Sequence, residues 1–496
     1  WLGLVGSEMC IRDRLNIILM TSYSEKLSIG EKIGYSLGDL AANLVFQTLM
    51  TYLAYFYTDI YGLDANDATA IIFTVGTIAA FGFNPIVGAI ADRTNSKWGK
   101  FRPWILWTAI PLGIVSVLAF STPNFEYQGK VVYAVITYTL LLLLYAASNL
   151  PYSALSGVIT GDMKERNSIS SYRFVAVMFA QFFVQVFMLP IIIYAGEGDK
   201  AVGIEIVMTW LAIIGTIMLL ITFITTKERI VPKLEQKSSV KEDLLDLIKN
   251  KPWVIMLLLT TLTFVSLAMK GGSYIYYFEN YVDEVRLTNF ISPILDFLST
   301  IGVNFFGNDP VSAGFGLFNA SGIIFMIIGI GMSKPLADTY GKRNVFGFFL
   351  FISTLFIILF SFFGKSSVEL MFGAQVLHGF FYGITIPLLW AMIADVADYS
   401  EWKNNRRATA IIFSAMMVGL KLGLTIGSSL VAKILGSYGY VPNGENGQTE
   451  IAIQGTKMLV SVYPAIPFLI GVSLLFFYEI NKKMETQIEL KLKERR

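Results

Sequence analysis

The chain has 496 residues, of which 54% are hydrophobic and only 15% are charged, and its mean hydropathy is +0.60. This composition lies far from that of a soluble domain and indicates a polytopic membrane protein surrounded by lipid. The net charge of +2 gives no sign of a nucleic-acid partner. The single cysteine excludes a disulfide framework or a cysteine metal cluster, and the sequence predicts no metal site.

The chain begins with WLGLVGSEMCIRDR, which is too polar for a spanning helix and lacks the apolar core of a signal peptide. The string resembles a translated sequencing-adapter read-through. We therefore expect residues 1–19 to be a non-native leader and the native sequence to begin near Met20.

Twelve segments of the chain are long and apolar enough to cross a bilayer. Such a helix needs about 20 mostly apolar residues, because its backbone polar groups must be satisfied within the segment. The sequence predicts an all-α membrane protein with an N-terminal six-helix bundle (20–226), a cytoplasmic linker (227–251), a C-terminal six-helix bundle (252–480) and a cytoplasmic tail (481–496). The predicted helices are 34–60, 67–91, 103–121, 130–159, 172–195, 203–226, 252–282, 312–336, 344–364, 368–394, 408–436 and 455–480.

Positively charged loops mark the side of a membrane protein that stays in the cytoplasm. The loops near 92–102, 162–173, 227–251, 334–343 and 403–407 are basic, whereas the alternate loops hold one Lys at most. We therefore expect a multi-pass monomer in the lipid of a bacterial inner membrane, with both termini in the cytoplasm.

Two loop sequences of the first half have counterparts in the second half. ADRTNSKWGK after the second predicted helix is matched by ADTYGKRN after the eighth, and GDMKERN is matched by ADYSEWKNNRR. A parallel repeat of six helices is the layout of the major facilitator superfamily, in which the substrate site lies near the bilayer midplane between the halves.

Polar side chains inside the predicted helices fall into stripes along single faces. The first helix carries Asp39, Asn43 and Gln47 at spacings of four residues. Polar groups in lipid are costly unless they face a cavity or a partner, and a mixture of amides, hydroxyls, aromatic faces and cations suits a small-molecule carbohydrate. The amides could equally tie helices together. The candidate substrate-binding residues are Asn43, Gln47, Tyr145, Asn149, Tyr152, Arg173, Lys270, Tyr274, His378 and Lys421.

The eleventh predicted helix combines a cation with small residues. Lys421 lies in GLKLGLTIG, whose glycines at 419, 423 and 427 permit a neighbouring helix to pack closely. A buried cation costs about 2.5 to 3.5 kcal/mol on insertion scales, which favours function over packing for Arg173 and Lys421. His378 could equally be a satisfied core histidine.

Nearly the whole chain, from about 25 to 480, resembles the glycoside-pentoside-hexuronide cation symporters, the melibiose-permease branch of the major facilitator superfamily. The resemblance rests on GYSLGDLAANLVF, FYTDIYGL, NPIVGAIADRTNSKWGKFRPW, SNLPYSALSGVIT, ERNSISSYRF, ADVADYSEWKNNRRAT and the Lys421 region. It implies that Asn43, Asn149 and Arg173 belong to the sugar site, with Tyr145 beside them, and that Lys421 faces the cavity. Melibiose permeases have Asp at the positions of Asn43 and Asn149, so the resemblance favours pentosides or uronides over galactosides.

The second predicted helix departs from this family. The resemblance implies an Arg and two Asp in this helix, with the two carboxylates binding the coupling Na⁺ or H⁺, but Thr77, Ala80 and Asn84 stand at those positions. A cation site wants anionic oxygens or a titratable group, and Ala80 and Asn84 provide neither. Either transport is uncoupled, or the coupling site has moved to another carboxylate such as Asp39. No cofactor other than such an ion is predicted.

The predicted cations also bear on the substrate. Arg173, Lys270 and Lys421, with few acids facing them, would suit an anionic sugar such as a uronide, although a neutral sugar is not excluded.

Charged residues of the cytoplasmic loops are candidates for gating between the two halves. We expect Asp92, at the C-terminal end of the second helix, to need a basic partner because the helix dipole disfavours an acid there. A pair of this kind could close one side of the transporter and break when the halves rock. The candidate gating residues are Asp92, Arg93, Lys100, Arg102, Asp338, Arg343, Asp398 and Glu401.

Two segments outside the spans are amphipathic. The outward loop 283–311 contains FISPILDFLSTIGVNFF, which could form an interfacial helix, a lid over the cavity or a tolerated insertion. In the linker, SVKEDLLDLIKN is expected to form a surface helix.

Three other functions fit the sequence less well than sugar transport. A lysolipid-type transporter would need a more apolar cavity, and a membrane sugar sensor would need a sizeable output domain. An enzyme is disfavoured, because one His and one Cys leave no metal or nucleophile constellation.

Overall fold

The computed structural model describes residues 26–160, 163–229, 249–303, 306, 309–404, 409–442 and 447–495. Within these ranges the chain is helical, with one isolated β-bridge between Ser96 and Gly99 in the turn after the second spanning helix. The expected leader at 1–19 and the expected surface helix at 239–250 lie in, or almost wholly in, segments outside the described residues.

The first bundle is built from six long helical runs, three of which contain a π-helical turn. They are α2 (Ile29–Tyr55) with η1 (Phe56–Ile60); α3 (Ala65–Ile78), η2 (Ala79–Phe83) and α4 (Asn84–Arg93); α5 (Arg102–Ala119); α6 (Tyr127–Ile159); α7 (Met163–Phe182), η3 (Phe183–Phe187) and α8 (Met188–Ala195); and α9 (Lys200–Thr225).

The second bundle repeats this plan and adds two shorter helices, α12 and α19. Its elements are α11 (Lys251–Asn280), α12 (Glu284–Thr300), α13 (Pro310–Tyr340), α14 (Lys342–Leu359), α15 (Val368–Asn404), α16 (Thr409–Ser437), α17 (Glu450–Val460), α18 (Val462–Leu474), η5 (Leu475–Phe477) and α19 (Lys482–Arg495).

Each of the twelve predicted spans corresponds to one helical run. Among the described residues, 11 helices are long and apolar enough to cross a membrane. The twelfth run, α2 with η1, has the length but a more polar face that includes Asn43, Gln47 and several tyrosines. This polar face turns into the protein, where α2 packs against α7 and α9, so burial in the bundle replaces contact with lipid.

Two predicted boundaries were wrong by about ten residues. Helix α7 begins at Met163 rather than 172, and α15 continues to Asn404 rather than 394. The sequence was interpreted as loop because of its charges, but those charges have partners: Glu165 pairs with Lys32 at 2.8 Å, and Asp395 pairs with Lys342. Ion pairs at the bundle surface thus allow both helices to extend into the polar region.

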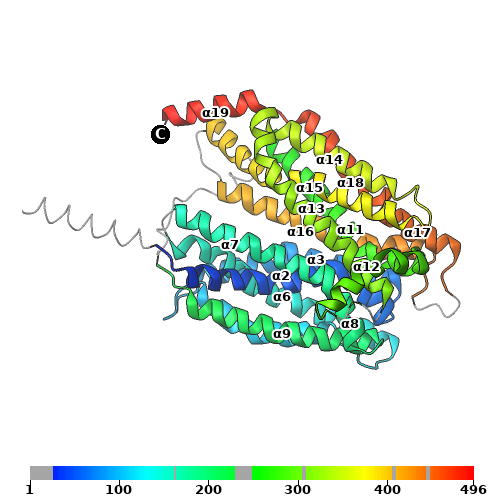
Figure 1. Ribbon diagram of the computed structural model, residues 1–496. Helices are drawn as coiled ribbons and strands as arrows, with labels where there is room; N and C mark the ends of the chain where they lie inside the picture. The colour runs from blue at the N-terminus through cyan, green and yellow to red at the C-terminus, as the bar shows by residue number, and fades with distance from the viewer. Residues whose placement is uncertain are drawn as a thin grey trace, which may run out of the picture.

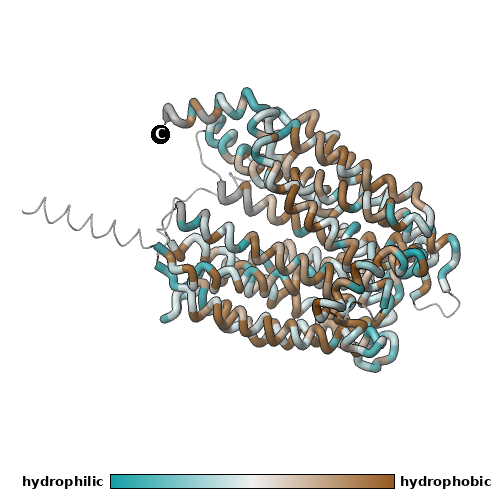
Figure 2. The backbone as a smooth tube through the Cα atoms, in the orientation of Figure 1, coloured by the Kyte–Doolittle hydropathy of each residue, from teal (hydrophilic) through white to brown (hydrophobic). Residues whose placement is uncertain are grey.

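The two bundles lie side by side and meet on one side of the molecule (Figure 1). We call the side that carries Leu27 and the C-terminal helix α19 the termini side, and the opposite side the far side. The contacts between bundles come mainly from α3 with α16, α11 with α2, and η3 and α8 with α13. On the termini side the bundles diverge (Figure 1). Hydrophilic residues gather toward both ends of the helices (Figure 2).

The glycines of α16 allow it to approach α11 closely, as the sequence predicted. A side chain on Gly423 would collide with the carbonyl oxygen of Thr261, and one on Gly427 with that of Val265. The backbones of α16 and α11 are therefore in direct contact, which fixes the position of Lys421 on α16.

The loop 283–311 contains the predicted amphipathic helix, α12. Its residues Leu287 and Ile291 are fully buried, and Phe290 packs on Phe372 of α15. Its opposite face carries the exposed polar residues Asn289 and Asp296, with the exposed Val285 among them. The helix is therefore amphipathic, as expected of an element at a membrane interface.

Candidate functional site

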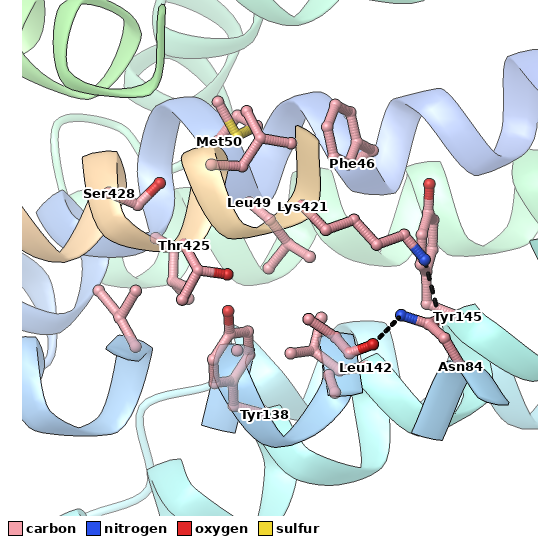
Figure 3. A pocket seen from close by; sticks show the side chains of 16 residues that line it. Phe46, Leu49, Met50, Asn84, Tyr138, Leu142, Tyr145, Lys421, Thr425 and Ser428 are labelled. Carbon is pink, nitrogen blue, oxygen red and sulfur yellow. Dashed lines mark hydrogen bonds between the residues drawn. The ribbon is translucent and has the colours of Figure 1, made fainter. Parts of the chain in front are cut away.

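A cavity lies between the two bundles, with walls from α2, α3, η2 and α6 of the first bundle and α16 of the second. The space between its atoms, open solvent included, is about 690 Å³. Figure 3 shows Lys421 and Thr425 facing Tyr138, Tyr145 and Asn84 across it. The lining is aromatic and aliphatic with a few polar groups, which is the usual composition of a small-molecule site. We call it the first cavity.

Lys421 and Asn84 join the two bundles at the edge of the first cavity. The ammonium of Lys421 donates a hydrogen bond of 2.8 Å to the side-chain oxygen of Asn84. Asn84 follows the π-helical turn η2 and precedes Pro85. Proline cannot complete the regular helical hydrogen bonds, which explains the wider turn, and the Asn84 amide returns a 3.4 Å bond to the carbonyl of Ala80.

The helix-two position does not fit a bound Na⁺. Three residues stand where the resemblance implies charged side chains. Thr77 and Asn84 have neutral side-chain oxygens, and Ala80 has no side-chain oxygen. The Asn84 oxygen already accepts from an ammonium, so a metal cation there would face a like charge. Among the described residues, no group of three or more His, Cys, Asp or Glu side chains could hold a metal ion.

Arg173 is held by an acid, which corrects the expectation that it faces the cavity with few acids near it. Its Nε donates to Asp39 at 2.8 Å, and Asn43 donates to the backbone and side-chain oxygens of the same Asp39 at 2.9 and 3.3 Å. The guanidinium also lies over the rings of Tyr35 and Tyr152. Because the Asp39 carboxylate balances its charge, Arg173 is a positioned donor and not a free cation.

The other predicted residues of the first bundle fall into separate places. Tyr145 lines the first cavity and accepts a 2.9 Å hydrogen bond from Asn149. Tyr152 is buried, stacks on Tyr35 with ring centroids 4.6 Å apart, and donates to the Tyr35 carbonyl. Gln47 is half-buried on α2, one turn after Asn43. Tyr152 therefore packs against the Arg173 guanidinium and does not line the first cavity.

A second cavity lies between α2, α7 and η3 of the first bundle and α11, α13 and α15 of the second, and the space between its atoms, open solvent included, is about 600 Å³. Lys270, Tyr274 and His378 all line it, so the structure brings these predicted residues together. Tyr274 donates to Gln375, and Asn319 donates to the Gln185 carbonyl across the bundle interface. Asn319 was missed in the sequence, although a lone Asn inside the predicted span 312–336 was a usable signal.

The far side of the interface is closed by hydrogen bonds and an ion pair that the sequence did not predict. Tyr440 donates to Asp59 at 2.6 Å, and Lys200 and Tyr55 both bind the Glu279 carboxylate at 2.6 Å. Burial and the Asp59 carboxylate raise the pKa of Tyr440 well above its ordinary value, so its phenol keeps its proton and donates. Every one of these contacts joins the two bundles. Acids at the ends of apolar spans, as in FYTDI and YYFEN, were the available signal.

The predicted gating residues lie on the termini side, and those whose contacts are described bind within their own bundle. The Glu228 carboxylate accepts from the backbone N–H groups of Lys100, Phe101 and Arg102 at 2.7 to 2.9 Å, and Arg102 also donates to the Phe223 carbonyl.

In the second bundle, Arg343 donates to the Tyr478 carbonyl, and the Asp338 carbonyl accepts from Lys482. Arg93 is exposed, and Asp398 and Glu401 lie on α15. The side chain of Asp92, whose expected basic partner motivated the gating hypothesis, lies outside the described residues.

Two six-helix bundles with cavities at their interface define a membrane transporter of the major facilitator type. The sequence profile described as MFS/sugar transport protein matches residues 34–308 and 297–482. The chain is 35% identical over 448 residues to the inner membrane symporter YicJ of Escherichia coli, with 90% of this chain and 91% of that protein covered. The chain belongs to the MFS/sugar transport family, which confirms its resemblance to glycoside-pentoside-hexuronide cation symporters.

A second relative agrees with this membership, and a solved structure agrees with the fold. The chain is 29% identical over 472 residues to an isoprimeverose transporter of Lactiplantibacillus pentosus, with 93% of this chain and 91% of that protein covered. The crystal structure of a bacterial homolog of the human lysosomal transporter Spinster, in an inward-facing and unoccupied conformation, matches with a TM-score of 0.61. It covers 94% of this chain and 98% of that one at 15% identity, so this likeness concerns the fold alone.

Proposed function

We propose that this chain carries a sugar across a bacterial inner membrane by alternating access between its two bundles. The basic loops support a cytoplasmic location for the termini side, and the hydrogen bonds from Tyr440 and Tyr55 close the far side. In this assignment the structure represents the inward-open state. Rocking of the bundles would break the far-side contacts and form new ones on the cytoplasmic side.

The transport is proposed to run without a cation at helix two. The observation that carries this proposal is the 2.8 Å hydrogen bond from Lys421 to Asn84. The Lys421 ammonium occupies the acceptor that a Na⁺ would need, and Asn84 has no proton to exchange near neutral pH. The position is therefore occupied by a cationic side chain of the protein.

The proposed substrate is a glycoside built from pentose or uronic acid units. Aromatic faces such as Tyr138 and Tyr145 suit stacking on a sugar ring, and the amides of the second cavity suit its hydroxyls. The isoprimeverose transporter among the relatives supports the pentoside class.

Entrance counterflow in proteoliposomes tests the transport proposal. Vesicles loaded with an unlabelled sugar should transiently accumulate the labelled sugar, since exchange needs no driving ion. A panel of xylosides, isoprimeverose and methyl glucuronide covers the proposed class, and protein-free vesicles are the control. If none of these sugars exchanges faster than in protein-free vesicles, the proposed function is wrong.

A further inference from the structure

The second cavity contains a cation with no acid beside it. Lys270 lines this cavity, and no Asp or Glu is among the lining residues. The contact found for its ammonium is with the ring of Tyr274, 5.6 Å from the ring centroid. Within the described residues, no carboxylate lies within ion-pair distance of Lys270. A cation without an acidic partner in a cavity strongly favours the binding of an anionic ligand.

The other two cations that the sequence singled out have protein partners. Arg173 is bound to Asp39, and Lys421 is bound to Asn84. An anionic group of a substrate would have to displace Asp39 to reach Arg173 fully. Lys270 therefore remains as the cation whose charge is available between the bundles.

His378 adds an acceptor to the same cavity. Its Nδ1 lies 2.8 Å from the Ser353 hydroxyl and 3.1 Å from the Ser353 carbonyl, and the hydroxyl in turn donates to the His378 carbonyl. This arrangement requires the proton on Nδ1. The opposite nitrogen, Nε2, is then an acceptor, and it is buried without a hydrogen-bond partner in the structure. An unpaired buried acceptor of this kind is costly and invites a donor from a ligand.

Amides from both bundles complete the lining. Gln181 and Gln185 come from α7 and η3, and Gln375 comes from α15. The Gln375 oxygen accepts from Tyr274, so its NH₂ group is the part left to donate. The NH₂ group of Gln375 packs against Gly322. Any other residue at position 322 would place its Cβ only 2.5 Å from the Gln375 nitrogen, so the glycine makes room for this amide. The cavity thus offers a cation, amide groups and an imidazole nitrogen without a partner, which matches a sugar that carries a carboxylate and hydroxyls.

We propose that the second cavity binds the carboxylate of an acidic sugar, with the Lys270 ammonium as its counter-ion and His378 Nε2 as the acceptor of a sugar hydroxyl. This inference rests on the proposed function, because the cavity opens between the two bundles that would move. It names the acidic class of substrate and assigns its recognition to Lys270.

Competition in the counterflow assay tests the inference with two sugars that differ only at C6: methyl β-D-glucuronide and methyl β-D-glucoside. In the unmodified protein the glucuronide should compete at a concentration at least tenfold lower than the glucoside. Lys270→Gln should weaken the glucuronide at least tenfold and change the glucoside less than about threefold, as expected for loss of a hydrogen bond to a charged group. Lys270→Arg should retain most of the preference. Lys365→Gln is the matched control, because that lysine pairs with Glu450 outside both cavities.

The outcomes separate the two proposals. The carboxylate assignment is wrong if the glucoside and the glucuronide compete at equal concentrations in the unmodified protein. It is also wrong if Lys270→Gln weakens competition by both sugars equally. In either case the proposal of sugar transport stands. If no sugar exchanges, the proposed function itself fails. The preference of the unmodified protein for the glucuronide over the glucoside tests the carboxylate assignment even when a Lys270 variant does not fold.

Discussion

The side-chain oxygen of Asn84 and the ammonium of Lys421 lie 2.8 Å apart and join the two bundles where the family's coupling carboxylate would stand. One residue belongs to the first bundle and the other to the second. Their contact must change whenever the bundles move relative to each other. Asn84, which stands in place of the acid, therefore forms a contact between the bundles that alternating access would change.

Removing this acceptor should slow transport. Asn84→Leu leaves the Lys421 ammonium without its partner, and hydrogen bonds to charged groups contribute about 1.5 to 3 kcal/mol. We expect the counterflow rate to fall about tenfold or more. Asn84→Asp keeps the acceptor and adds a charge, so it should retain activity and acquire a dependence on pH or Na⁺. Counterflow measured across pH and Na⁺ concentration checks both variants, and an Asn84→Leu protein as fast as the unmodified one would show that the contact is dispensable.

The Asp39 and Arg173 pair should behave as one unit. Either Asp39→Asn or Arg173→Gln removes one charge and leaves the other without compensation, whereas the double variant removes both. In a double-mutant cycle on thermal unfolding in detergent, we expect a coupling of about 1 to 3 kcal/mol, moderated because the Arg173 side chain is 26% exposed. Additive effects of the two substitutions would contradict the pairing.

The far-side closure can be tested with a matched pair of tyrosines. Tyr440→Phe removes a 2.6 Å hydrogen bond to Asp59 that joins the bundles. Tyr127→Phe removes a 2.6 Å bond to Asp67 that lies within the first bundle. Thr51 serves as the reporter position, because it is buried on α2 in the wall of the second cavity. In a background without Cys10, we expect Tyr440→Phe to raise the labelling of a Thr51→Cys reporter by a membrane-impermeant maleimide about tenfold in intact cells.

Tyr127→Phe should leave that labelling rate unchanged within about twofold. Equal effects of the two substitutions would mean that the Tyr440 contact does not hold the far side closed.

The close contact of α16 and α11 predicts a sharp difference between two glycines. Gly423→Val places a branched side chain against the Thr261 carbonyl, so α16 must move away from α11 at a cost of at least 1 to 3 kcal/mol. Gly331→Ala is the control, because a Cβ at that position meets no atom within 4 Å. We expect a lower midpoint of thermal unfolding for the first variant alone, and comparable midpoints would contradict the packing.

The sequence predicted the elements better than the contacts between them. Hydropathy located all twelve helical runs, and polar stripes located Tyr145, Lys270 and Lys421 on the cavity walls. The partners could not be predicted, since Asp39 and Arg173 are 134 residues apart and meet only after α2 and α7 pack. Arg173 was therefore interpreted as a free cation when its acid was already named in another role.

Charges at helix ends were also hard to interpret. Residues 163–171 and 395–404 were assigned to loops because charge usually marks the end of a span, although the helices continue and pair their charges at the bundle surface. The sequence also predicts no role for Asp59 and Glu279. Each is a single acid at the end of an apolar run, and its meaning depends on a tyrosine or lysine from another helix.

The most direct measurement compares sugar accumulation in proteoliposomes under three conditions: no ion gradient, an inward Na⁺ gradient, and an inward proton gradient. Because the Lys421 ammonium occupies the Asn84 oxygen, we predict that labelled sugar reaches the external concentration and no more in all three conditions. Accumulation well above the external concentration under either gradient would contradict uncoupled transport. Such a result would show that a coupling ion binds elsewhere in the protein.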